Sequence, residues 1–62
     1  MLVEKVRFTV TSKNRKTRKR VKQRQVVEVS YYISKIDMLR LTMQMQATLT
    51  PAGHDFVDIS ID

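Results

Sequence analysis

The sequence predicts an all-β protein with a four-stranded antiparallel sheet, whose strands lie near residues 2–11, 21–33, 39–50 and 55–62. In each segment apolar and polar residues alternate with a period of two, which is typical of strands that bury one face. The chain has a single glycine, and small closed barrels usually need several glycines where their strands coil sharply. The sheet is therefore expected to form either a small barrel or, in preference, a homodimer in which two sheets pack face to face.

The first two strands are expected to form a long hairpin. Their alternating apolar residues are Val6, Phe8, Val10, Val27, Val29, Tyr31 and Ile33. Between these two runs, residues 13–20 contain no apolar side chain, so they fit an exposed connection. The chain is thus expected to be one small domain, residues 1–62, with a basic hairpin loop at 13–24.

The third segment supports two structures. From Leu39 to Thr50 every odd position is apolar and every even position is polar, which fits a strand at each position. However, Met, Leu, Arg, Gln and Ala are good helix formers, and Ser34 followed by Asp37 resembles a capping box. The alternation favours the strand, and the alternative is an α+β fold with a helix near 35–47.

The last segment is expected to be a short strand with one acidic face. Val57, Ile59 and Ile61 alternate with polar residues, and the turn signal Pro51-Ala52-Gly53 precedes the segment. The polar residues of this alternation are Asp58, Ser60 and Asp62.

The positive charge is concentrated in one stretch. Eight of the twelve residues from Lys13 to Arg24 are Lys or Arg and none is acidic, whereas the net charge of the whole chain is +6. The other fifty residues therefore sum to −2 (6 − 8), and such a local field indicates a polyanionic partner. Lys and Arg at this density neutralise phosphates, so DNA or RNA is the expected partner. The candidate nucleic-acid-binding residues are Lys13, Arg15, Lys16, Arg18, Lys19, Arg20, Lys22 and Arg24.

This basic stretch resembles the arginine-rich RNA-binding motifs of viral and phage regulatory proteins, and it equally resembles a nuclear-localisation signal. The first resemblance implies a nucleic-acid-binding regulator of a phage or mobile element. A second hypothesis is a small structural or inhibitory protein whose basic arm binds an acidic protein. That arm could instead bind the acidic strand of a neighbouring copy around Asp55, Asp58 and Asp62, which gives a homo-oligomer.

The run Leu49-Thr50-Pro51-Ala52-Gly53-His54-Asp55-Phe56-Val57-Asp58 resembles the end of certain small bacterial and phage winged-helix domains. The resemblance covers the C-terminal half, and residues 1–24 do not match the pattern. It implies DNA binding, with a helix at Tyr31–Leu39, a wing closed by Leu49 and Thr50, and a last helix beginning in Asp55–Asp62.

The chain lacks the side chains that catalysis and metal binding usually need. It has no cysteine and one histidine, so His54 with Asp55 and Asp58 offers too few soft ligands for a metal. We expect no enzymatic activity and no cofactor. No stretch approaches the roughly 20 apolar residues of a membrane helix, so no membrane partner is expected. Lack of cysteine fits a cytoplasmic protein.

Overall fold

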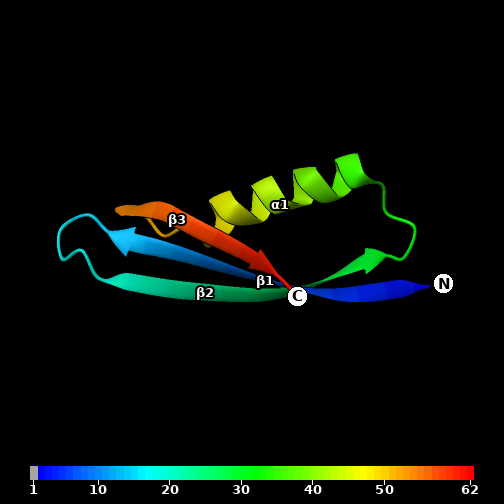
Figure 1. Cartoon of the computed structure of the whole chain (residues 1–62), viewed down its shortest axis with the longest axis horizontal. Coiled ribbons are helices and arrows are strands. Elements are labelled where there is room, and N and C mark those ends of the chain that lie inside the picture. The colour runs from blue at the N-terminus through cyan, green and yellow to red at the C-terminus, as the bar shows by residue number, and fades with distance from the viewer. Residues whose placement is uncertain (1) are drawn as a thin grey trace.

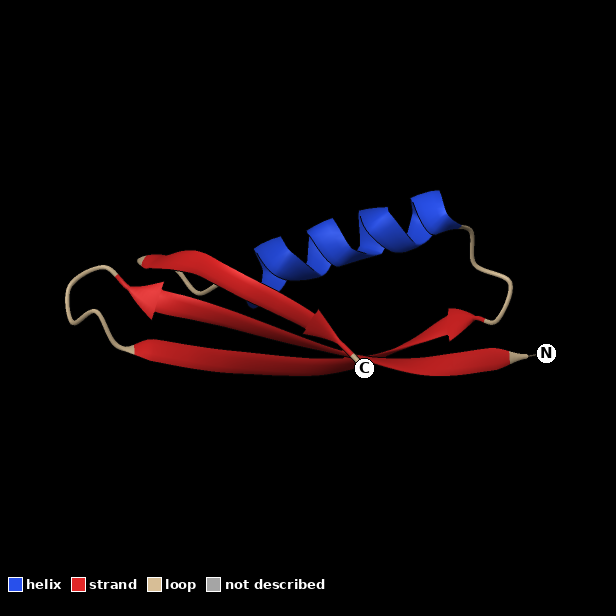
Figure 2. Cartoon of the chain, in the orientation of Figure 1, coloured by secondary structure: helices blue, strands red, loops and turns tan. Residues whose placement is uncertain are grey.

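The computed structural model describes residues 2–62 and has an α+β fold (Figure 1). In chain order the elements are β1 (Val3–Asn14), β2 (Arg20–Ser30), α1 (Lys35–Leu49) and β3 (His54–Ile61). The three strands form one antiparallel sheet in the order β2-β1-β3, and α1 lies along one face of it (Figure 2). The predicted four-stranded all-β fold is wrong, whereas the α+β alternative with a helix near 35–47 agrees with this architecture.

The segment predicted as a strand at 39–50 is a helix, which buries the apolar face of the three-stranded sheet. The Ser34 side chain caps α1 by accepting a hydrogen bond from the Asp37 backbone N–H at 3.1 Å. On the face of α1 toward the sheet lie Met38, Leu41, Met45 and Leu49. Their spacing of three and four residues places them on one side of a helix. The alternation included three of these residues but omitted Met38, so it concealed the helical stripe.

The core lies between α1 and the central strand. On β1, the even-numbered residues Val6, Phe8, Val10 and Ser12 are buried. Val6 and Phe8 form the core cluster with Val29 of β2 and Met45 of α1. The apolar face of the sheet is therefore covered by a helix of the same chain, and neither barrel closure nor a second sheet is needed for this purpose.

The strand boundaries also differ from those predicted. β1 and β2 extend farther into the basic stretch than residues 11 and 21, and they leave only residues 15–19 as the connection. At its other end β2 stops at Ser30, so Tyr31 and Ile33 are not strand residues. Tyr31 was expected to face the core but is 61% exposed, because the chain turns there to reach α1.

Ser12 gives a test of the core. It is fully buried, and among residues 2–62 its Oγ has no hydrogen-bond partner. A buried hydroxyl without a partner costs about 1–3 kcal/mol, so S12A is expected to raise the free energy of unfolding by about 1 kcal/mol. Urea unfolding followed by circular dichroism measures this change, with S60A on the exposed part of β3 as the control. The control should change by no more than about 0.5 kcal/mol. A less stable S12A protein would contradict the account of this residue.

Candidate nucleic-acid interface

The sheet face opposite α1 is open and charged. Directly opposed residues of antiparallel strands place their side chains on the same face. Since the even-numbered residues of β1 face α1, the odd-numbered residues and their partners on β2 and β3 face away from it. We call this surface the open face. It carries Lys5, Arg7 and Lys13 from β1, Arg20, Lys22, Arg24 and Glu28 from β2, and Asp55, Asp58 and Asp62 near β3.

The strand register turns the basic stretch into an ordered row of cations. On β2, Arg20, Lys22 and Arg24 alternate with Val21 and Gln23, so all three cations project from the open face. Alternate residues of a strand are about 7 Å apart. The row therefore offers one cation for about every two phosphates along one strand of a DNA duplex, whose phosphates are spaced about 3.4 Å along the axis.

Lys13 and Arg20 are directly opposite each other in the β1–β2 ladder. Like charges at this position repel, because opposed Cβ atoms are only about 4.5–5.5 Å apart. An anion between them removes this repulsion and interacts with both cations. On its other side Lys13 is opposite Asp55, so this pair lies next to a carboxylate of β3.

The turn that joins β1 and β2 is held by its own hydrogen bonds. Asn14 Oδ1 accepts the backbone N–H groups of Lys16 and Thr17 at 2.8 and 2.9 Å. The Arg18 N–H donates to the Asn14 carbonyl at 2.8 Å, and Arg18 has a φ of 61°. The Asn14 N–H donates to the Lys19 carbonyl at 2.9 Å. The cations of the turn thus project from a defined loop.

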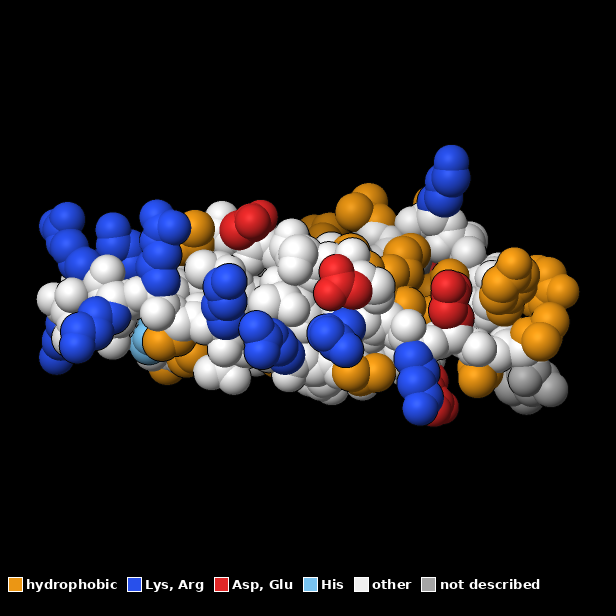
Figure 3. Space-filling view, turned by 60° about the horizontal axis from the view of Figure 1, so that its bottom comes forward, with side chains coloured by type: hydrophobic (Ala, Val, Ile, Leu, Met, Phe, Trp, Pro, Cys, Tyr) orange, Lys and Arg blue, Asp and Glu red, His pale blue; other side chains and the backbone are white. Residues whose placement is uncertain are grey.

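The eight predicted residues fall into two groups. Four lie on strands and face the open side: Lys13, Arg20, Lys22 and Arg24. The other four lie in the turn at the end of the molecule: Arg15, Lys16, Arg18 and Lys19. Lys and Arg side chains gather at this end, and hydrophobic side chains gather at the opposite end (Figure 3). Because the molecule is 45 Å long and only 17 by 14 Å across, the two ends are well separated.

Arg15 differs from the other cations of the turn. Its Nε lies 2.9 Å from Asp55 Oδ1, and both side chains are 65% exposed. The pair joins the turn to β3, where the Arg15 N–H also donates to the Gly53 carbonyl at 3.1 Å. An ion pair this exposed stabilises the fold little, so an anion can displace Asp55 from Arg15 at low cost.

Two cations of the open face were missed from the sequence. Lys5 and Arg7 are exposed residues of β1 on the same side as Lys13. The signal was present, since both alternate with the buried Val6 and Phe8 and so belong to the polar side of the strand. The prediction omitted them because it selected residues by the density of charge along the chain. It did not consider which face of the sheet each residue lies on.

Acidic residues limit the interface on the β3 side. Opposite Lys13, Thr11 and Arg7 of β1 lie Asp55, Asp58 and Asp62. Across the sheet the charge therefore changes from positive on β2 to negative on β3. A phosphate backbone is expected to follow β2 and the turn and to avoid β3.

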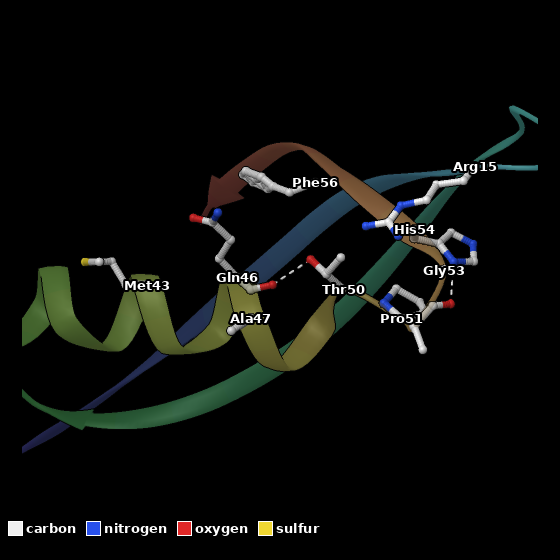
Figure 4. A pocket seen from close by; sticks show the side chains of 10 residues that line it. Arg15, Met43, Gln46, Ala47, Thr50, Pro51, Gly53, His54 and Phe56 are labelled. Atoms are coloured by element: carbon white, nitrogen blue, oxygen red, sulfur yellow. Dashed lines mark hydrogen bonds between the residues drawn. The ribbon is translucent and has the colours of Figure 1, made fainter.

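A hollow lies at the C-terminal end of α1 (Figure 4). Its volume is about 450 Å³, and it is lined by Met43, Gln46, Thr50, His54 and Phe56 among others. Thr50 Oγ1 donates to the Gln46 carbonyl at 2.6 Å, and His54 Nδ1 lies 3.2 Å from the Ala52 carbonyl oxygen. These side chains contact nearby backbone groups and do not form a nucleophile–base pair.

Residues 2–62 contain no group of three or more His, Cys, Asp or Glu side chains that could hold a metal ion. Within the same residues, α1 is neither long nor apolar enough to cross a membrane.

The segment that resembles winged-helix domains spans the end of α1, the turn that follows it and the start of β3. Leu49 is the last residue of α1, Thr50 is its C-cap, and His54–Ile61 form β3 where the resemblance implied a helix. Comparison of the chain with protein-family models, curated proteins and solved structures found no match.

Proposed function

We propose that the chain binds nucleic acid, contacting the phosphate backbone through the open face of β1 and β2 and through the turn between them. The observation that carries this proposal is the arrangement of Arg20, Lys22 and Arg24 on one exposed side of β2, next to Lys13. A strand distributes alternate side chains to one face, so these cations act together on an extended polyanion.

The interface contacts phosphates and carries few groups that read bases. Half to two-thirds of protein–DNA hydrogen bonds go to phosphate and sugar, and these position the protein without reading sequence. Besides cations, the open face near β2 offers Thr9 and Thr11, which lie opposite Arg24 and Lys22. The two tyrosines, Tyr31 and Tyr32, lie at the other end of β2 and contact each other edge to face. Binding is therefore expected to depend little on sequence.

With no cysteine, the chain needs no oxidising compartment. We place its function in the cytoplasm.

The salt dependence of binding tests this function. If about six of the cations on the open face and turn each neutralise one phosphate, log affinity for duplex DNA falls with log salt at a slope near −5. Electrophoretic mobility shift assays over a salt series measure the slope. Parallel series with single-stranded DNA and structured RNA identify the preferred nucleic acid. Binding that does not change with salt, or no binding to any of the three at low salt, would sink the proposal.

A further inference from the structure

The two outer strands of the sheet have opposite charges on the open face. β2 presents Arg20, Lys22 and Arg24, and the β3 side presents Asp55, Asp58 and Asp62; all six residues are exposed. In residues 2–62 neither strand has a partner on its outer side, because β1 occupies the middle of the sheet. Such edges present unpaired backbone N–H and C=O groups to another chain, and β3 has a bulge at Val57, where its register with β1 shifts.

Three ways of joining two copies keep both α1 helices on the same side of a continuous sheet. A two-fold axis can pair β3 with β3 antiparallel, or β2 with β2 antiparallel. The first brings three carboxylates toward three carboxylates. The second joins two edges that each carry three cations and Glu28, a net charge of +2 (3 − 1) apiece, so like charges predominate in both cases. A translation pairs β3 of one copy with β2 of the next in parallel, and this arrangement brings the carboxylates of β3 toward the cations of β2.

We propose that the chain self-assembles head to tail, with β3 of each copy pairing with β2 of the next. The register within one sheet shows how the charges align. Lys13 is opposite both Arg20 and Asp55, so these two residues lie at the same level on the two edges. Thr11 is likewise opposite both Lys22 and Asp58. A copy displaced sideways at the same level therefore sets Asp55 beside Arg20 and Asp58 beside Lys22.

Apolar surface on the β3 side supports the same partner. Val57 and Ile61 of β3 are 41% and 45% exposed, and Met43 on the neighbouring side of α1 is 63% exposed. Met43 and Phe56 line the same hollow, so this side of α1 borders β3 (Figure 4). The residues of β2 that face the α1 side include the exposed Gln25, which leaves room there for a neighbouring helix. Pairing of β3 with β2 thus covers apolar side chains as well as carboxylates.

The contacts that these carboxylates make within one chain do not prevent the assembly. Asp55 pairs with Arg15 at an exposed position, and Asp58 Oδ1 accepts the backbone N–H of Ile59 at 2.8 Å. The Ile59 N–H becomes available to the incoming strand when Asp58 turns to Lys22 of the neighbour. A phosphate and the carboxylate of a neighbouring copy compete for Arg20 and Lys22, so bound nucleic acid opposes self-assembly. Self-assembly is therefore tested with protein freed of nucleic acid.

Charge reversal on one edge at a time tests the assembly by analytical ultracentrifugation. The wild-type chain has a mass of 7.3 kDa, and its mean mass should rise with concentration at about 0.1 M salt. It should return to 7.3 kDa at about 1 M salt, where the Debye length falls from about 10 Å to about 3 Å. The variants R20E/K22E and D55K/D58K should each stay monomeric alone, because each has one repelling interface. An equimolar mixture should assemble, because both interfaces then join opposite charges again.

Three results would overturn the proposal. Association of R20E/K22E alone points to a two-fold β3 dimer, and association of D55K/D58K alone points to a two-fold β2 dimer. A wild-type mass of 7.3 kDa at every concentration and salt excludes self-assembly. The four substituted residues are exposed, so circular dichroism should confirm that both variants fold. Since no nucleic acid is present, these outcomes leave the proposed binding function to its own test.

Discussion

Replacing Arg20 and Lys22 by Ala is expected to weaken binding to duplex DNA about 60-fold at about 0.1 M salt. Each phosphate contact contributes about 0.9 to the salt exponent, which corresponds to roughly eightfold in affinity between 0.1 and 1 M salt. Two contacts together thus give a factor of about 60. Fluorescence anisotropy with a labelled duplex measures the affinity of R20A/K22A. Both residues are exposed on β2, so the loss reflects the interface and not the fold.

The chain supplies a matched control for this variant. Lys35 and Arg40 are exposed residues of α1, outside the open face. The variant K35A/R40A therefore lowers the net charge by two, as R20A/K22A does. If the position of the charges matters, the control should bind within about threefold of wild type. Equal losses in the two variants would show that the net charge attracts DNA without a defined interface.

Replacing Phe8 by Ala is expected to unfold most of the protein at 37 °C. Phe8 is fully buried in the centre of β1 and belongs to the core with Val6, Val29 and Met45. A buried Phe to Ala change costs about 3–5 kcal/mol. At about 0.05–0.15 kcal/mol per residue, a chain of 62 residues has only about 3–9 kcal/mol of stability. Thermal unfolding followed by circular dichroism measures the loss.

Tyr32 provides the aromatic control for Phe8. It is 77% exposed and contacts Tyr31 edge to face, so Y32A should cost no more than about 1 kcal/mol. Should F8A lose no more stability than Y32A, the core assigned to β1, β2 and α1 would be wrong.

The sequence predicted three of the four elements because their alternation has a direct physical cause. Val6, Phe8 and Val10 alternate since β1 buries one face against α1, and Val27 and Val29 continue that face on β2. The helix was expected only as the alternative because the residues from Leu39 to Thr50 also alternate, although α1 buries Met45 and exposes Leu39 and Met43. The decisive consideration was tertiary, since a small sheet with one apolar face must be covered.

The sequence identified most residues of the candidate site but not the secondary structure on which they lie. Charge density alone identified the residues from Lys13 to Arg24, yet it described them as a loop. Only the strand register separates Arg20, Lys22 and Arg24 on the open face from the cations of the turn. The register also adds Arg7 and Lys5 to the cations of the open face. It places Asp55 and Arg20 at the same level of the sheet, which their separation in the sequence does not reveal.

The salt slope of the two double variants tests the central claim most directly, because it counts the phosphate contacts that each pair of residues makes. The affinities of wild type, R20A/K22A and K35A/R40A for one duplex should be measured from about 0.05 to 0.3 M salt. If the open face is the interface, the slope of R20A/K22A is smaller than that of wild type by about 2. The slope of K35A/R40A should then equal that of wild type. An unchanged slope for R20A/K22A would contradict the claim that this face binds the phosphate backbone.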